Sequence, residues 1–196
     1  MKRVFDVLAA GLGLIVLWPV ILLTAIAVRL NSPGPGILAQ RRIGRDGRQF
    51  TCYKLRTMHQ NTAQVPTHQV GVSALTSIGG FLRRSKLDEL PQLLNVLRGD
   101  MSLVGPRPCL PTQAELIEAR SRLGALGVLP GVTGLAQIQG VDMSDPARLA
   151  AIDAQYARTR TFGGDLLIIL RTLTGSGMNA DPARGDLARE RRNADG

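Results

Sequence analysis

An uncharged segment near the beginning of the chain limits its fold more than any other feature. No charged side chain occurs between Val7 and Val28, and most residues of this segment are strongly apolar. Because an α-helix rises about 1.5 Å per residue, a helix of this length can cross the roughly 30 Å apolar core of a bilayer. The sequence therefore predicts a membrane-inserted helix over residues 1–30.

The middle and the flanks of this segment argue against an ordinary membrane span. Pro19 removes a hydrogen bond inside the helix and favours a kink. Positive charges favour the cytoplasmic side, yet they occur at both ends: Lys2 and Arg3 precede the segment, and Arg29, Arg41, Arg42, Arg45 and Arg48 follow it. A re-entrant helix that bends at Trp18 and Pro19 satisfies both observations, because its backbone hydrogen bonds stay internal. The rival interpretation is a signal peptide cleaved after Ala27, but its apolar core would exceed the usual length of roughly 7–15 residues.

The charge balance predicts an anionic partner. The chain has 24 basic and 15 acidic residues, a net charge of +9, and its basic residues are arginines except for Lys2, Lys54 and Lys86. Guanidinium groups bind phosphate through paired donors, although a GC-rich genome also favours arginine. Two well-separated cysteines exclude a disulfide scaffold and a thiol zinc cluster. One Trp, two Tyr and four Phe are too few for a base-stacking nucleic-acid binder.

After the membrane segment, the sequence predicts a compact domain over residues 31–174 and a flexible tail over 175–196. Asp46-Gly47 is a hairpin turn signal between strands at 37–43 and 49–55, with Lys54 and Arg56 on one face of the second strand. Residues 59–73 have the composition of a polar loop. Three helix starts follow, at a Thr112–Glu115 capping box, at Asp145-Pro146, and after Asp165 before a leucine-rich stretch that is either core or membrane-surface helix.

Candidate chemistry is concentrated between Arg83 and Pro108. Leucines at helical spacing (Leu87, Leu90, Leu94, Leu97) predict a helix that begins near Asp88 and ends at Gly99, because Pro91 is tolerated only in a first turn. The carboxylates of Asp88 and Glu89 then lie at an anion-attracting helix start, where Arg83, Arg84 and Lys86 keep them ionised and receive phosphate oxygens. The competing interpretation is a capping box in which Asp88, with Ser85, only satisfies backbone amides.

A second candidate is Arg107, which lies between Pro106 and Pro108. The two prolines fix its backbone before a ligand arrives, which suits a phosphate contact, whereas an ordinary turn with a solvated arginine is the alternative. The same choice between phosphate contact and solvated strand face applies to Lys54 and Arg56. No Walker or dinucleotide-binding pattern occurs, so ATP and NAD sites are not predicted.

Taken together, these stretches resemble the bacterial sugar transferases that are monotopic polyprenyl-phosphate phosphoglycosyl transferases. The matching stretches cover nearly the whole chain: KRVFDVLAA, QRRIGRDGRQFTCYKLRTM, FLRRSKLDELPQLLNVLRGDMSLVGPRP, LPGVTGLAQIQG and DLLIILRTL. The resemblance implies an α/β, mostly helical monotopic membrane protein, with a re-entrant helix, a small β-hairpin and interfacial amphipathic helices. It also implies transfer of a sugar 1-phosphate from a UDP-sugar to undecaprenyl phosphate, with release of UMP, at the cytoplasmic face of the bacterial inner membrane.

The resemblance further implies roles for single residues. Asp88 becomes the nucleophile that forms a covalent aspartyl phospho-sugar, Glu89 a ligand of Mg²⁺, and Arg107 a contact of the nucleotide-sugar. The other phosphate-binding candidates are Lys54, Arg56, Arg83 and Arg84. Some positions depart from the family's usual residues, so the resemblance assigns no particular sugar: Ala74, Gly80, Lys86 and Val141.

Two non-catalytic alternatives stay open at this point. A membrane-tethered basic module that binds anionic lipid or nucleic acid would explain the charge and the anchor, and a membrane scaffold would explain the amphipathic helices. Neither alternative requires adjacent carboxylates among arginines. For the enzyme, the expected partners are a UDP-sugar, undecaprenyl phosphate and membrane phospholipids, and no nucleic acid is expected. The sequence does not decide between a monomer and a homodimer.

Overall fold

The computed structural model describes residues 1–59 and 74–175, and within them the chain is mostly helical, with two small sheets. The expected polar loop at 59–73 and the expected tail at 175–196 lie almost wholly outside the described residues. The longer elements are α1 (Lys2–Asn31), β1 (Ile37–Ile43), β2 (Gln49–Leu55), α2 (Gly79–Arg84), α3 (Gln92–Arg98), α4 (Ala114–Arg122), α6 (Pro146–Thr159) and α7 (Phe162–Leu173). The short elements are η1 (Arg45–Gly47), η4 (Leu87–Glu89), β3 (Ser102–Val104), η5 (Ala125–Gly127), β4 (Gly131–Thr133) and α5 (Leu135–Ile138).

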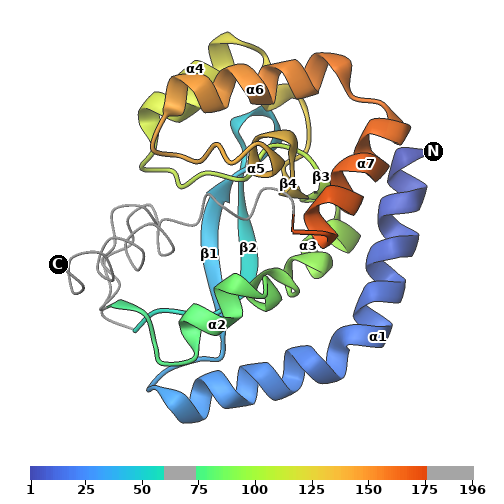
Figure 1. Ribbon diagram of the computed structural model, residues 1–196. Helices are drawn as coiled ribbons and strands as arrows, with labels where there is room; N and C mark the ends of the chain where they lie inside the picture. The colour runs from blue at the N-terminus through green and yellow to red at the C-terminus, as the bar shows by residue number, and fades with distance from the viewer. Residues whose placement is uncertain (60–73, 176–196) are drawn as a thin grey trace, which may run out of the picture.

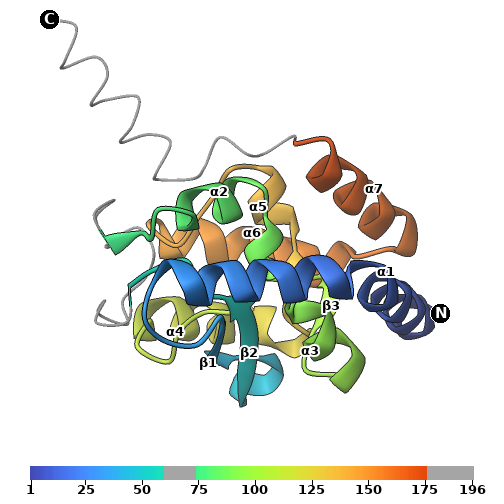
Figure 2. The same ribbon diagram turned by 90° about the horizontal axis from the view of Figure 1, so that it is seen from below.

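Helix α1 is long and apolar enough to cross a membrane. Figure 1 shows that it bends about midway along its length, and Pro19 lies inside it, where a missing backbone donor permits such a bend. Figure 2 shows its second half running across the underside of the body. Most of its large apolar side chains are exposed, so α1 carries an apolar surface that no described residue covers: Val4, Leu8, Leu12, Ile15, Val16, Trp18, Leu22, Leu23, Ile26 and Leu30.

Polar contacts join the first turns of α1 to the body. The buried Asp6 carboxylate accepts a hydrogen bond from the Ser102 hydroxyl at 2.8 Å, and Arg3 donates to the carbonyls of Val96 and Leu97, at the end of α3. A buried carboxylate without partners would be costly, so these contacts fix how α1 enters the body.

The β1–β2 hairpin was predicted with its bounds and is confirmed. The strands pair antiparallel, from Ile37 opposite Leu55 to Ile43 opposite Gln49. Asp46 and Gly47 both have positive φ, 56° and 73°, which is the conformation that an Asp-Gly turn supplies at low cost. The hairpin stands in the centre of the body between α2 and α3 on one side and α4 and α6 on the other (Figure 1).

A second, parallel sheet of β3 and β4 was not predicted. It pairs Ser102 with Gly131 and Val104 with Thr133. A Cβ on Gly131 would lie 2.1 Å from the backbone nitrogen of Gly105, so glycine is required here for two backbone segments to approach each other. This approach gives Gly131 a structural role.

The three later helices begin only partly as expected. Asp145 caps α6 by accepting a hydrogen bond from the Arg148 amide at 3.0 Å, which confirms that start. The Thr112–Glu115 capping box is wrong, because Gln113 is the N-cap residue of α4 and makes no side-chain cap. Helix α7 begins before Asp165 rather than after it, because Thr161 caps it; its exposed apolar residues are Phe162, Leu166, Leu167, Leu170 and Leu173.

Candidate active site

Asp88 and Glu89 lie on the single turn η4, in the chain reversal between α2 and α3. Lys86 precedes this turn with a φ of 57°, a conformation that costs a non-glycine residue free energy. The long helix predicted from Asp88 is therefore interrupted, and α3 proper begins at Gln92 and ends at Gly99 as expected. The predicted leucine face holds only in part, because Leu87 and Leu97 pack against core clusters while Leu94 is exposed. The residues that α3 buries are Gln92, Asn95 and Val96.

The capping-box interpretation of Asp88 is not supported. The Ser85 hydroxyl donates to the carbonyls of Phe81 and Leu82 in its own helix, and η4 has no side-chain cap. Asp88 is only 9% exposed, so its carboxylate lies in a largely buried position beside Glu89.

Electrostatics at Asp88 differ from the sequence expectation. Burial, together with the neighbouring Glu89 carboxylate, raises the pKa of Asp88 to about 7, although positive charges of Lys54, Arg107 and Arg83 oppose this shift. The expectation that basic neighbours keep both acids fully ionised is therefore wrong for Asp88. Desolvation of a carboxylate outweighs the attraction of the cations around it.

Three cations from separate parts of the chain lie around the two acids, and a fourth, Arg42, lies beside them. Arg107, in the loop after β3, places Nη2 2.7 Å from Glu89 Oε1. Lys54 on β2 has a pKa lowered to about 8 by burial and by the charge of Arg42, while Asp88 opposes the shift. Arg83 on α2 donates from Nε to the Thr57 hydroxyl at 3.0 Å. The structure therefore brings Lys54, Arg83 and Arg107 together with the acids.

Arg42 is a member of this cluster that the sequence did not indicate as a site residue. It lies on β1, where burial and the charge of Arg107 lower its pKa to about 10. Its Nη1 donates to the Pro108 carbonyl at 3.1 Å, which places it beside the Arg107 turn. In the sequence, Arg42 is recognisable only as one residue of an alternating strand pattern. Its contacts with the site could not be predicted, because its partners are distant in the chain.

Arg56 and Arg84 do not join the cluster in the same way. Arg56 is buried and donates to the carbonyls of Ser32, Gly34 and Pro35, so it holds the turn that follows α1. Arg84 is exposed at the end of α2. A phosphate contact by either arginine stays a prediction that these placements do not support.

A buried ion pair supports the backbone of Arg107. Arg120 donates from Nη1 to the Arg107 carbonyl at 2.9 Å and from Nε to Asp153 Oδ2 at 2.8 Å. The side chains of Arg120 and Asp153 are both 3% exposed. The turn around Arg107 is therefore fixed by α4 and α6 as well as by its two prolines.

The oxygen donors beside Glu89 suit a hard divalent cation. A cavity of about 90 Å³ has polar lining from Glu89, Thr133, Gln137 and Thr172, and Gln137 Oε1 is buried without a hydrogen-bond partner among the described residues. The rest of its lining is Lys86 and the apolar side chains of Leu90, Leu93 and Val132. Within the part of the chain that the structure describes, no group of three or more His, Cys, Asp or Glu side chains occurs. Mg²⁺ is usually held by one or two carboxylates together with substrate phosphates, so this donor set fits it.

Comparison with known proteins adds a family to this geometry. A family model described as "Bacterial sugar transferase" matches residues 1–177. The UDP-glucose:undecaprenyl-phosphate glucose-1-phosphate transferase of Caulobacter vibrioides is 43% identical over 182 residues, which cover 88% of this chain and 68% of that protein. The exopolysaccharide production protein ExoY of Rhizobium meliloti is 36% identical over 189 residues, 88% of this chain and 83% of that protein. An Aeromonas hydrophila protein named UDP-N-acetylgalactosamine-undecaprenyl-phosphate N-acetylgalactosaminephosphotransferase is 36% identical over 187 residues, 90% of this chain and 44% of that one.

Proposed function

We propose, because the chain belongs to the bacterial sugar transferase family, that it transfers a sugar 1-phosphate from a UDP-sugar to undecaprenyl phosphate and releases UMP. The chain is an enzyme of the phosphoglycosyl transferase type, as its relatives are. The observation that carries the proposal is a buried Asp88 carboxylate beside Glu89, within the electrostatic influence of Lys54, Arg107 and Arg83, which are cations that suit phosphate. Relatives named for different sugars share similar identity with this chain, so no sugar is assigned.

The reaction proceeds in two displacements at one phosphorus atom. A carboxylate oxygen of Asp88 attacks the sugar-linked phosphorus of the UDP-sugar, and the bond to UMP breaks, with UMP taking the electron pair. A phosphate oxygen of undecaprenyl phosphate then attacks the same phosphorus, and the aspartyl–phosphorus bond breaks. Asp88 regains its carboxylate, and the product is a polyprenyl diphospho-sugar.

The cations around Asp88 serve this chemistry in two ways. Lys54 and Arg83 favour the ionised form of Asp88, which is the nucleophilic form, because their charges lower its pKa. Arg107, 44% exposed, has donors left for diphosphate oxygens beside its pair with Glu89. Negative charge that builds up on the transferring phosphoryl group is stabilised by groups already in place.

Glu89 and the amide oxygen of Gln137 are the residues that would hold Mg²⁺. When bound, Mg²⁺ would neutralise part of the negative charge of the diphosphate, which would otherwise repel the attacking carboxylate. Arg107 is positioned to exchange its contact with Glu89 for one with the nucleotide phosphate.

The membrane arrangement is part of the proposal. Helix α1 enters the cytoplasmic leaflet of the inner membrane, bends and returns, with α7 at the membrane surface beside its first half. Phe5 of α1 and Phe162 of α7 stack edge to face at 5.3 Å, which supports a shared apolar surface. Cysteines added directly after Met1 and at exposed Pro33 should both resist an impermeant maleimide applied outside intact cells. Because native Cys52 and Cys109 are buried, labelling reports the added cysteines, and labelling of either from outside would contradict a re-entrant helix.

The catalytic proposal is tested with a panel of UDP-sugars. Membrane-embedded protein, undecaprenyl phosphate and Mg²⁺ should release UMP from at least one sugar, while Asp88→Asn should release none. A non-catalytic basic module would release no UMP from any member of the panel. In that case the wild type and the Asp88→Asn variant would bind anionic lipid equally well.

A further inference from the structure

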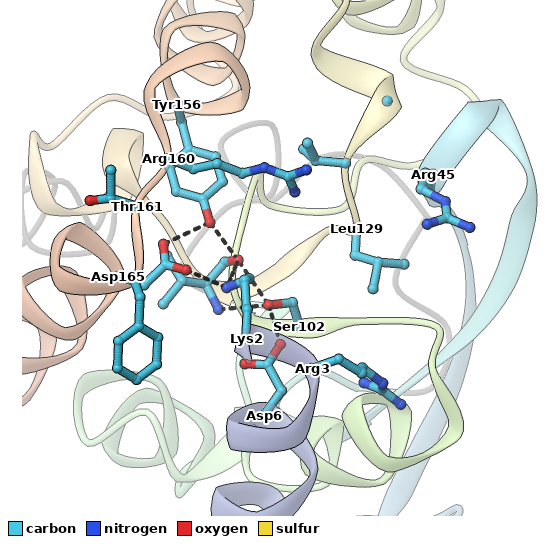
Figure 3. Close-up of a pocket in the computed structure, with 14 residues that line it drawn as sticks. Lys2, Arg3, Asp6, Arg45, Ser102, Leu129, Tyr156, Arg160, Thr161 and Asp165 are labelled. Carbon is cyan, nitrogen blue, oxygen red and sulfur yellow. Dashed lines mark hydrogen bonds and ion pairs between the residues drawn. The ribbon is translucent and has the colours of Figure 1, made fainter.

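A second cavity has a volume of about 400 Å³. It lies between the first turns of α1, the junction of α6 and α7, and η1 (Figure 3). Asp88, Glu89, Lys54 and Arg107 are not among its lining residues. The proposed transfer reaction therefore leaves this cavity without a role.

The acidic residues in its wall are already satisfied. Asp6 is 2% exposed, and its oxygens accept hydrogen bonds from the Ser102 hydroxyl and the Leu103 amide. Asp165 is 4% exposed, accepts from the Tyr156 hydroxyl at 2.8 Å and pairs with Lys2. Both carboxylates are therefore occupied by contacts with other residues of the cavity wall, which Figure 3 marks as dashed lines.

Two of the three arginines of this cavity have donors available for a ligand. Figure 3 shows Arg3 from α1, Arg45 from η1 and Arg160 from the junction between α6 and α7 around the open space. Arg3 donates hydrogen bonds to the carbonyls of Val96 and Leu97 at the end of α3, so its donors are occupied. Arg45 lies 3.4 Å from Asp46, but both side chains are more than half exposed, so water screens this pair. The Arg160 guanidinium forms no hydrogen bond or ion pair with another side chain among the described residues. Two guanidinium groups therefore line one cavity: Arg160 has no side-chain partner among the described residues, and Arg45 has only the exposed Asp46.

The position of the cavity indicates where such an anion comes from. Phe162 at the start of α7 lines the cavity with an exposed apolar side chain and packs edge to face against Phe5 of α1. Val128 and Leu129 form an apolar part of its wall. A ligand that bears one phosphate and long apolar chains would satisfy the arginines and cover the flanking surface at the same time.

We propose that this cavity binds the phosphate of an anionic phospholipid headgroup, held by Arg45 and Arg160, with the acyl chains along the apolar surfaces of α1 and α7. Such a lipid would reinforce the contacts of Arg3 and Asp6 that fix the entry of α1 into the body.

The test measures lipid retained by the full chain. Wild type, Arg45→Gln/Arg160→Gln and the control Arg48→Gln/Arg158→Gln are extracted from nanodiscs of equal phosphatidylglycerol and phosphatidylcholine and studied by native mass spectrometry. The control removes the same charge from exposed arginines outside the cavity. Wild type and control should retain one phosphatidylglycerol, and the cavity variant should lose at least tenfold in occupancy. Equal retention by the cavity variant, or equal loss by the control, would overturn the proposal.

Two further arms keep the result decisive. If the double variant does not fold, Arg160→Gln alone is judged by the same criteria, because the Arg160 guanidinium forms no hydrogen bond or ion pair with another side chain within residues 1–59 and 74–175. Glycerol 3-phosphate is then compared with short-chain phosphatidylglycerol in thermal unfolding of the wild type in detergent. The lipid should raise the midpoint and glycerol 3-phosphate should not, whereas equal shifts would assign the cavity to a soluble phosphate compound and overturn the lipid assignment.

Discussion

The buried pair of Arg120 and Asp153 gives the sharpest prediction about stability. Arg120 Nη2 lies 2.6 Å from Asp153 Oδ2, and both side chains are 3% exposed. Burial raises the pKa of Asp153 even though the charge of Arg120 opposes this, so desolvation outweighs the attraction within the pair. Removing one partner leaves a buried charge without compensation, which costs about 3–5 kcal/mol.

We therefore expect Asp153→Asn and Arg120→Met each to lower the midpoint of thermal unfolding by roughly 6–20 °C, at about 2–4 °C per kcal/mol for a chain of this size. The double variant Arg120→Met/Asp153→Leu should recover much of the loss, because two apolar side chains leave no charge behind. It should not recover turnover fully, because the Arg107 carbonyl has lost its donor.

The assay is a fluorogenic maleimide in detergent micelles, which reacts as the protein unfolds. Cys52 and Cys109 are buried, and burial raises the pKa of both thiols, so neither should react in the folded protein. A fall of less than about 2 °C for the single variants, or a double variant as unstable as the sum of the singles, would refute this reasoning.

Three further predictions follow from the site. Arg107→Ala should reduce turnover far more than the unfolding midpoint, and Arg107→Lys should restore turnover only in part, because a lysine lacks the forked donor pair; equal losses of turnover and stability would favour a purely structural role. Asn95→Ala should lower the unfolding midpoint, because the fully buried Asn95 amide bonds the Tyr53 N–H and the Thr51 carbonyl, at about 1–3 kcal/mol for each group left unpaired; an unchanged midpoint would contradict this. Removal of divalent cations with EDTA should abolish UMP release and added Mg²⁺ should restore it, while Glu89→Gln should need more Mg²⁺; an unchanged Mg²⁺ titration would remove Glu89 as its ligand.

Features with local causes could be predicted from the sequence. The hairpin bounds follow from Asp46-Gly47, the end of α3 from Gly99, and the start of α6 from Asp145-Pro146, because each depends on the conformation or hydrogen bonds of a few adjacent residues. The adjacency of Asp88 and Glu89 and the apolar character of α1 needed no tertiary information. The family was recognisable for the same reason, since its motifs are continuous stretches of chain.

Features with distant causes could not be predicted. Strands β3 and β4 have three residues each, too few for a pattern, and they pair because Gly105 and Gly131 allow close approach. Arg42 joins the site through partners far along the chain. The raised pKa of Asp88 depends on how much water the fold removes, which no local pattern contains.

The central claim is that Asp88 carries the sugar phosphate during the reaction. Wild-type protein is mixed with a reactive UDP-sugar and Mg²⁺ in the absence of undecaprenyl phosphate, and UMP and intact protein mass are followed together. We predict release of up to one UMP per active site, a mass increase equal to one sugar phosphate on the peptide that contains Asp88, and neither signal for Asp88→Asn. UMP release only after the lipid acceptor is added, with no adduct on the protein, would contradict the claim and favour direct attack by undecaprenyl phosphate.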